Sequence, residues 1–186
     1  MTTPDLLRPV LVGGTGRSGS TIVGHLLDHH PDLTLTRPME VRFIAGTDGL
    51  ADALAVAQAA PHSQKAASAA DLAVNRLRTR WFQRAEHVGL HESMSQGDVE
   101  GWSDEYLAAF EDDPLGATQL LTQRIMQRIA ERLGASRLVD TTPANARKAD
   151  LLEPIYPDSN VVVVTRDGRD VSASFVSQTF GPDDVF

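Results

Sequence analysis

A glycine-rich loop with one arginine is the segment of this chain best suited to bind a phosphate group. Residues 10–21 read Val-Leu-Val-Gly-Gly-Thr-Gly-Arg-Ser-Gly-Ser-Thr, so an apolar β-branched run leads into glycines and hydroxyl side chains. From Gly19 onwards the apolar residues recur with helical spacing, and we expect the loop to end at a helix N-terminus. Backbone N–H groups and the positive end of the helix dipole would then face a bound anion.

This loop lacks the lysine that loops for nucleoside triphosphates carry. Counted from Gly14, the pattern G-x-x-x-x-G-K-[ST] has its second glycine at Gly19 and has Ser20 in the lysine position. The cation of the loop is Arg17, three residues earlier. The sequence therefore predicts a loop for a 5′-phosphate that is poorly suited to a triphosphate with magnesium. A P-loop kinase or NTPase stays the alternative from the same scaffold.

A second segment combines a predicted strand with a possible anion-binding pair. Four consecutive valines at 161–164 indicate a buried parallel strand, which turns through Asp-Gly into a helix that begins near Asp170. Arg166 and Ser174 are eight residues apart. With this spacing the arginine can lie at the strand end and the serine two turns into the helix, close enough to share one phosphate. Ser172 is the alternative ligand if the helix begins elsewhere.

The two motifs, Gly-Arg-Ser-Gly-Ser-Thr at 16–21 and Arg-Asp-Gly-Arg-Asp-Val-Ser-Ala-Ser at 166–174, resemble the signature motifs of the PAPS-dependent sulfotransferases. In that family the first loop binds the 5′-phosphosulfate of 3′-phosphoadenosine 5′-phosphosulfate (PAPS), and an Arg…Ser pair with this spacing binds the 3′-phosphate. The resemblance implies that PAPS and its product PAP are held by Gly16, Arg17, Ser18, Gly19, Ser20, Thr21, Arg166 and Ser174.

One branch of the family matches further. Leu-Asp-His-His-Pro at 27–31 and Glu-Val-Arg at 40–42 resemble the tyrosylprotein sulfotransferases and their bacterial relatives. The resemblance covers roughly residues 8–45 and 137–178. Two departures accompany it. Thr141 stands where many relatives have a lysine, and relatives continue well beyond the second motif, which implies a compact variant or a chain that lacks its last part.

The resemblance also implies a mechanism. A hydroxyl of the acceptor attacks the sulfur of PAPS in line with the leaving phosphate, and no metal is required. Arg17 occupies the position of the family's catalytic lysine or arginine, and Glu40 matches the base of the glutamate-using branch. If Glu40 is not the base, His25 or His91 is the next candidate. The acceptor is a small molecule, a sugar, a lipid or a peptide.

A second class of function, a non-catalytic module that binds adenosine 3′,5′-bisphosphate, stays open beside the enzyme. Such a module would have no use for a base at Glu40. Asp140 and Thr142 are interpreted as helix-capping residues rather than catalysts, since a threonine before Pro143 is a good helix start. The aromatic residues of the middle of the chain, and most of the histidines, indicate core or solvent-facing positions rather than a cofactor or metal site.

Composition limits the number of domains and the classes of function that this chain can have. The chain has 186 residues, enough for one domain over residues 1–186, and a net charge of −8 argues against a nucleic-acid binder. It has no cysteine, and its start resembles no signal peptide. No apolar run approaches the length of a transmembrane segment, and we expect a cytoplasmic protein.

The predicted fold is α/β, a P-loop-type parallel sheet flanked by helices, with a helical insert at about 50–134. Besides the two strands above, strands are expected at 33–36 and 137–140. Within the insert, the helices are expected at about 50–60, 64–86, 103–112 and 115–133, because glycine and proline punctuate the apolar periodicity there.

Overall fold

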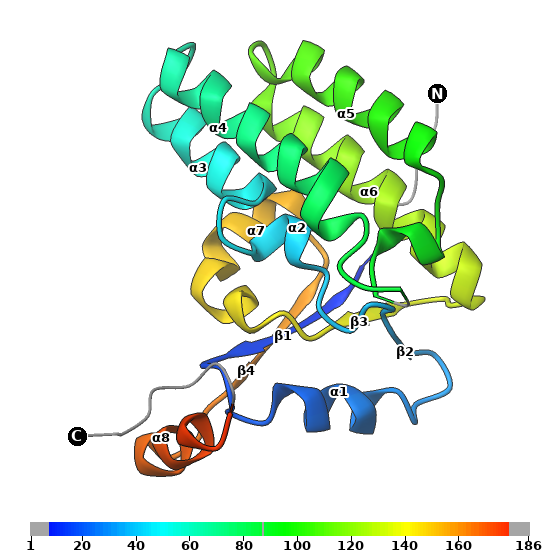
Figure 1. The fold of residues 1–186 in the computed structure, drawn as a ribbon, viewed down its shortest axis with the longest axis vertical. Helices are drawn as coiled ribbons and strands as arrows, with labels where there is room; N and C mark the ends of the chain where they lie inside the picture. Colours follow the sequence, from blue (N-terminus) through cyan, green and yellow to red (C-terminus); the bar gives the residue numbers. More distant parts are fainter. Residues whose placement is uncertain (1–7, 87, 179–186) are drawn as a thin grey trace.

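A four-stranded parallel sheet forms the centre of the computed structural model, which describes residues 8–86 and 88–178. The strand order is β2-β3-β1-β4, and the bounds are β1 (Val10–Gly14), β2 (Thr34–Leu35), β3 (Leu138–Asp140) and β4 (Asn160–Val164). Helices cover the sheet on both faces (Figure 1). The predicted α/β class with a parallel sheet and flanking helices is confirmed.

β1 lies inside the sheet because its apolar residues can pack on both faces. It pairs with β4 along its whole length, from Val10 opposite Asn160 to Gly14 opposite Val164, and Leu11 lies opposite Asp140 of β3. In a parallel sheet the carboxyl ends of all strands meet at one edge, so the segments that follow β1, β3 and β4 come together.

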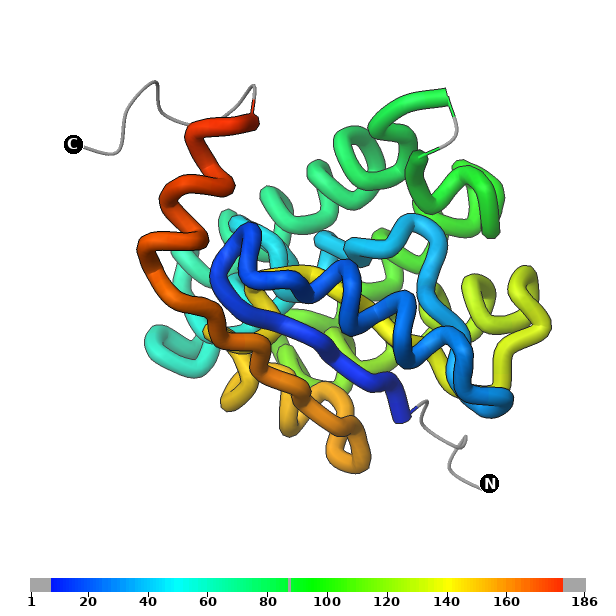
Figure 2. Tube along the Cα trace, turned by 90° about the horizontal axis from the view of Figure 1, so that it is seen from below, coloured from blue at the N-terminus to red at the C-terminus, as the bar shows by residue number. Residues whose placement is uncertain are grey.

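The helices are distributed unequally over the two faces. Figure 1 shows α1 (Ser20–Leu27) below the sheet and the helices from α2 to α7 above it, and in Figure 2 α1 runs back alongside β1. The bounds of the upper helices are α2 (Arg42–Ala45), α3 (Leu50–Ala59), α4 (Gln64–Arg76), η1 (Leu77–Trp81), η2 (Leu90–Glu92), α5 (Gln96–Phe110), α6 (Pro114–Leu133), η3 (Pro143–Lys148) and α7 (Ala149–Ile155). The last helix, α8 (Gly168–Val176), follows the end of β4 and stands apart from the others.

Two apolar clusters reflect this distribution. The larger one lies between the sheet and the upper helices, and it includes Leu11 of β1 and Ile125 of α6. The smaller one lies between the sheet and α1, where Val12 and Val139 are buried against Val23 and Leu27. The helical insert therefore belongs to the main core. On the opposite face of the sheet, α1 covers only the smaller cluster.

The prediction that the valine strand is buried is wrong. β4 pairs only with β1 in the described part of the chain, and none of its residues is buried. Val163 is 58% exposed, because it lies on an edge strand at a place that the upper helices do not cover. Four valines in a row indicate a strand, but they do not tell whether that strand lies inside the sheet or at its edge.

Two helices of the insert differ from their predicted bounds. The helix expected at 64–86 ends as an α-helix at Arg76 and continues as the π-helical turn η1 to Trp81. The helix expected at 103–112 begins seven residues earlier, at Gln96, because Ser95 and Asp98 form a capping box and the helix tolerates Gly97 and Gly101. Among the described residues, no helix is both long and apolar enough to cross a membrane.

Candidate functional site

The phosphate loop leads from the carboxyl end of β1 into α1. After Gly14 the chain turns through Thr15, whose carbonyl oxygen accepts the Ser18 N–H at 3.1 Å. Arg17 and Gly19 have φ angles of 68° and 104°, so the backbone is left-handed at both positions, which glycine adopts at no steric cost. Gly19 caps α1 without a side-chain hydrogen bond. The N–H groups of the first turn of α1 thus have no capping side chain and can receive an anion.

The loop is packed tightly against its surroundings. A Cβ atom on Gly14 would collide with the Val164 carbonyl oxygen and would lie 2.7 Å from Ser18 Oγ, and one on Gly16 would come within 3.0 Å of the Phe175 ring. Ser18 is 6% exposed, and its hydroxyl has no hydrogen-bond partner within the described residues. A buried hydroxyl without a partner costs free energy, which a bound anion would offset.

The second motif meets this loop directly. Arg17 Nε donates to Ser174 Oγ at 3.1 Å, and Arg166 Nη1 donates to the Arg17 carbonyl oxygen at 3.2 Å. Arg166 Nε also lies 3.8 Å from Asp170 Oδ2. The alternative ligand, Ser172, donates instead to the Gly168 carbonyl oxygen within α8. Two segments about 150 residues apart in the sequence therefore share one polar cluster, in which Ser174 rather than Ser172 contacts the loop.

Exposure differs among the predicted phosphate-binding residues. Ser18 and Ser20 are buried, whereas Arg17, Thr21 and Arg166 are exposed. The serines thus contribute to the packing of the loop, and the two guanidinium groups face solvent, where a doubly phosphorylated ligand can reach them.

Glu40 lies at the same edge of the sheet, beyond the end of β2, and it is bound to Arg42. Arg42 Nε donates to Glu40 Oε2 at 2.6 Å, and its Nη2 contacts the same oxygen. The neighbouring Met39 carbonyl oxygen accepts both the N–H and the hydroxyl of Thr141. Among the described residues, no hydrogen bond or ion pair joins Glu40 to Arg17.

A buried carboxylate connects the segment of Glu40 to the strand of the phosphate loop. Asp140 Oδ1 accepts the Val41 N–H at 2.9 Å and the Thr142 hydroxyl at 2.8 Å, and its Oδ2 accepts Asn145 Nδ2 at 2.8 Å. Asn145 Nδ2 also lies 3.3 Å from the Val12 carbonyl oxygen of β1. Burial raises the pKa of Asp140, and these donors oppose that shift.

The two residues interpreted as caps act differently from that prediction. Thr142 stands in the N-cap position of η3, but its hydroxyl makes no capping bond and donates to Asp140. Asp140 is 1% exposed and holds three segments together. Thr141, in the lysine position of many relatives, is buried against α1, where a Cβ atom on Gly24 would collide with its methyl group.

A family model decides what kind of protein carries this site. The model described as "Sulfotransferase family" matches residues 9–184. The chain belongs to the sulfotransferase family. Membership implies a transferase enzyme that moves a sulfuryl group. No curated protein and no solved structure matches the chain.

Of the two alternative bases, His25 is exposed and lines the larger of two cavities described below, whereas His91 of this sulfotransferase offers little to a proton transfer. His91 Nδ1 lies 3.1 Å from the Phe82 carbonyl oxygen, and its Nε2 lies 3.0 Å from the Glu86 carbonyl oxygen. With both ring nitrogens next to carbonyl oxygens, His91 has no nitrogen left for an acceptor hydroxyl. His87 lies outside the described residues. Within the part that is described, no group of three or more His, Asp or Glu side chains is placed to hold a metal ion.

Arg42 belongs to the Glu-Val-Arg motif at 40–42, but the sequence of this sulfotransferase did not predict the electrostatic interactions of Arg84 with Arg42, Arg80 and Glu40. Arg42 begins α2, Arg80 belongs to η1, which packs against α2, and Arg84 follows shortly after η1. The pKa of Arg84 is lowered, first by partial burial and then by the charges of Arg42 and Arg80, while Glu40 acts in the opposite direction. The repetition of arginine at 76, 78, 80 and 84 was the available signal.

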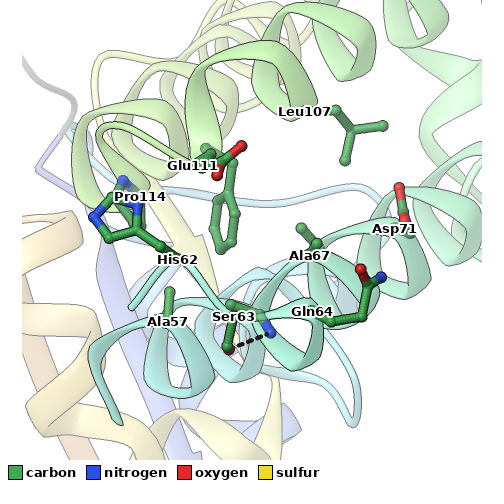
Figure 3. A pocket seen from close by; sticks show the side chains of 12 residues that line it. Ala57, His62, Ser63, Gln64, Ala67, Asp71, Leu107, Glu111 and Pro114 are labelled. Atoms are coloured by element: carbon green, nitrogen blue, oxygen red, sulfur yellow. Dashed lines mark hydrogen bonds between the residues drawn. The ribbon is translucent and has the colours of Figure 1, made fainter. Parts of the chain in front are cut away.

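Two cavities lie outside the phosphate loop. A cleft of about 860 Å³ lies between the segment 34–39, α1 and the parts of the insert around Val88 and Arg132. A smaller cavity of about 250 Å³ is lined by helices of the insert, and its lining includes Phe110. Figure 3 shows the carboxylates of Asp71 and Glu111 beside it. Only the first borders the segment that leads to Glu40.

Proposed function

We propose that this sulfotransferase moves the sulfuryl group of PAPS to a hydroxyl of its acceptor by in-line displacement, with Glu40 as the base. The contact of Arg17 with Ser174, and of Arg166 with the loop backbone, carries the proposal. It brings the residues expected to bind the 5′- and 3′-phosphates within hydrogen-bond distance of each other. The unpartnered hydroxyl of Ser18 and the uncapped start of α1 fit an anionic ligand at the same place.

In the proposed reaction the acceptor oxygen forms a bond to sulfur while the bond from sulfur to the 5′-phosphate oxygen breaks. The loop N–H groups, Ser20 and Thr21 hold the 5′-phosphate, and Arg17 stabilises the negative charge that develops on it. Glu40 takes the proton of the acceptor hydroxyl.

Donor binding tests the first half of the proposal. Calorimetry in EDTA should show that adenosine 3′,5′-bisphosphate binds more tightly than AMP or ATP, because only the bisphosphate fills both sites without magnesium. Arg166→Ala should cost about 1.5–3 kcal/mol of this affinity, the usual range for a charge-assisted hydrogen bond. Ser174→Ala should also weaken binding, and Ser172→Ala is the matched control. Equal affinity for AMP and the bisphosphate would remove the 3′-phosphate site.

Turnover tests the second half. Glu40→Gln should keep donor affinity and slow sulfuryl transfer about a hundredfold to ten-thousandfold, the usual cost of losing a general base. The deficit should shrink with nitrophenols, which are partly ionised before they bind. Arg17→Ala should also act mainly on turnover, since the charge it meets develops in the transition state. Near-normal turnover of an alkyl alcohol by Glu40→Gln would exclude this residue as the base.

A further inference from the structure

Glu40 lies in an irregular segment between two anchored parts of the chain. Residues 37–41 belong to neither a helix nor a strand. Before them, the Thr36 N–H donates to the Val139 carbonyl oxygen of β3 at 2.9 Å, and after them Phe43 of α2 is buried in the larger apolar cluster. The regular hydrogen bonds of a helix or strand therefore do not fix the backbone at Glu40, although the role proposed for its carboxylate depends on where that backbone lies.

The end of β3 and the residue after it bind the peptide groups on either side of Glu40. The carbonyl group before Glu40 belongs to Met39, and its oxygen accepts the Thr141 N–H at 3.0 Å and the Thr141 hydroxyl at 2.9 Å. The N–H group after Glu40 belongs to Val41, and it donates to Asp140 Oδ1 at 2.9 Å. These three hydrogen bonds, here called the Glu40 clamp, hold the backbone on both sides of Glu40.

The clamp is tied to the strand of the phosphate loop. β3 pairs with β1 in the sheet, and Asn145 Nδ2 donates to Asp140 Oδ2 at 2.8 Å. The same nitrogen lies 3.3 Å from the carbonyl oxygen of Val12, one residue before the glycines of the loop. Asp140 and Thr141 are both buried, so water competes little for these hydrogen bonds. The place of Glu40 relative to the loop is thus set through β3 rather than through its neighbours in the sequence.

We propose that Thr141, together with Asp140, is a positioning residue of this sulfotransferase, which holds Glu40 where its carboxylate can receive the proton of the acceptor hydroxyl. The inference rests on the proposed function, because it takes Glu40 as the base. Arg42 Nε donates to the carboxylate itself at 2.6 Å, while the clamp fixes the backbone that carries it. A displacement of about 1 Å in a catalytic group can cost about a hundredfold in rate, so loss of a clamp bond should appear in turnover.

Two variants at Thr141 separate its hydroxyl from its packing. Thr141→Val removes the donor to the Met39 carbonyl oxygen and keeps the methyl group that packs against Gly24 of α1, whereas Thr141→Ser keeps the hydroxyl and removes that methyl group. At saturating PAPS, kcat of Thr141→Val should fall about tenfold to a hundredfold at unchanged KM for the acceptor, and Thr141→Ser should stay within about threefold of the wild type. Thr118→Val is the matched control and should keep full turnover, because the buried Thr118 also donates to a backbone carbonyl oxygen, that of Pro114 in α6.

Two acceptors and a double variant test whether Thr141 acts through Glu40. 4-Methylphenol and 4-nitrophenol have similar size, but the second is partly ionised before it binds and depends less on a base. The loss in Thr141→Val should therefore be smaller with 4-nitrophenol. In the Glu40→Gln background, Thr141→Val should add at most about a twofold loss, because the group that it positions is already inactive. Equal losses with both phenols, or a full additional loss in the double variant, would show a merely structural effect and would overturn the inference.

Hydrogen exchange in the complex with adenosine 3′,5′-bisphosphate tests the clamp without turnover. The Val41 N–H should exchange about fivefold faster in Thr141→Val than in the wild type, because opening of the segment breaks one hydrogen bond fewer, and at the wild-type rate in Thr118→Val. An unchanged rate in Thr141→Val would overturn the clamp. Faster exchange together with near-normal turnover of 4-methylphenol by Glu40→Gln would support the clamp and contradict the proposed function. Normal turnover by Thr141→Val beside a slow Glu40→Gln would overturn the inference and leave the proposed function in place.

Discussion

The two segments expected to bind the donor phosphates are built differently, although each follows a valine-containing strand and each contains glycine and arginine. The first, the phosphate loop at 13–21, buries Ser18 and Ser20. The second, which leads into α8, contains no buried residue in that helix. The first is thus held in shape by the core, and the second by its contacts with the first.

Strand order explains this difference. β1 lies between β3 and β4, so its loop is surrounded by other segments, while β4 pairs with β1 alone in the described part of the chain. Arg17, Arg166 and Ser174 provide the polar contacts that hold the second segment to the loop, together with the Phe175 ring beside Gly16. If the proposed function is right, the 5′-phosphate site would be preformed and the 3′-phosphate site would be stabilised further by the bound donor.

The largest expected effect is on stability, and it contrasts Asp140, at the end of the strand β3 beside β1, with Asp167, at the start of α8 in the second segment. Asp140→Ala should lower the free energy of unfolding by about 3 kcal/mol, because buried donors of Val41, Thr142 and Asn145 lose their acceptor. Asp167→Ala removes the exposed cap of α8, where its side chain accepts the Arg169 N–H, and an exposed ion pair with the Arg169 guanidinium. Typical cap losses are about 1 kcal/mol, and less is expected from a helix outside the core. Urea unfolding of both variants measures the contrast.

Equal losses in the two aspartate variants would contradict the comparison, since they would mean that α8 unfolds together with the core. Asp140→Asn serves as the control for volume, because it keeps the shape of the side chain and one acceptor oxygen.

A pair of glycines tests the same comparison at the level of packing. A Cβ atom on Gly13 would collide with the backbone nitrogen of Ala146, whereas one on Gly168 would meet nothing within 4 Å. Gly13→Ala should cost about 1–3 kcal/mol of stability, the usual range for overpacking, and Gly168→Ala should stay within about 0.5 kcal/mol of the wild type. Thermal unfolding measures both. A tolerated Gly13→Ala would show that η3 can move away from β1.

Much of this site could be predicted because its signals are local. The apolar run before the glycines predicts β1 and its loop, and the eight-residue spacing of Arg166 and Ser174 predicts that one follows a strand and the other lies in the next helix. Ser174 does meet the loop, through Arg17. The roles proposed for these residues stay predictions, as does the division of the chain into one domain with a helical insert.

Other features depend on packing between distant segments, which local patterns do not contain. The edge position of β4 follows from strand order, so its exposed Val163 could not be predicted from the valine run. The π-helical turn η1 ends the α-helix at Arg76, which the glycine and proline residues that bound the predicted helix at 64–86 do not indicate. Arg84, which follows η1, acts electrostatically on Arg42 and Glu40, and only the packing of η1 against α2 brings these segments together.

The smallest expected effect is the pH dependence of the free energy of unfolding. The contributions of Asp140 and Asp167 to it have opposite signs. Burial raises the pKa of Asp140, whereas hydrogen bonds from Arg169 lower the pKa of the exposed Asp167. As pH rises above about 4, the ordinary value for an aspartate, the unfolded chain releases its proton from Asp140 before the folded protein does. The free energy of unfolding then falls, by at most about 1.4 kcal/mol per pH unit, until the pH passes the raised pKa of the folded state.

Asp140→Asn has no such proton to release, so the stability of the wild type relative to this variant should decrease as pH rises from about 4 through that window. For Asp167 the sign is reversed: its contribution is present above its ordinary pKa and is lost as the pH falls through the lowered one. Asp167→Asn should therefore lose less stability than the wild type on acidification. Urea unfolding of the three proteins between pH 3 and pH 8 measures both differences. A constant difference between the wild type and Asp140→Asn would mean that Asp140 stays ionised throughout, because its hydrogen bonds outweigh its burial.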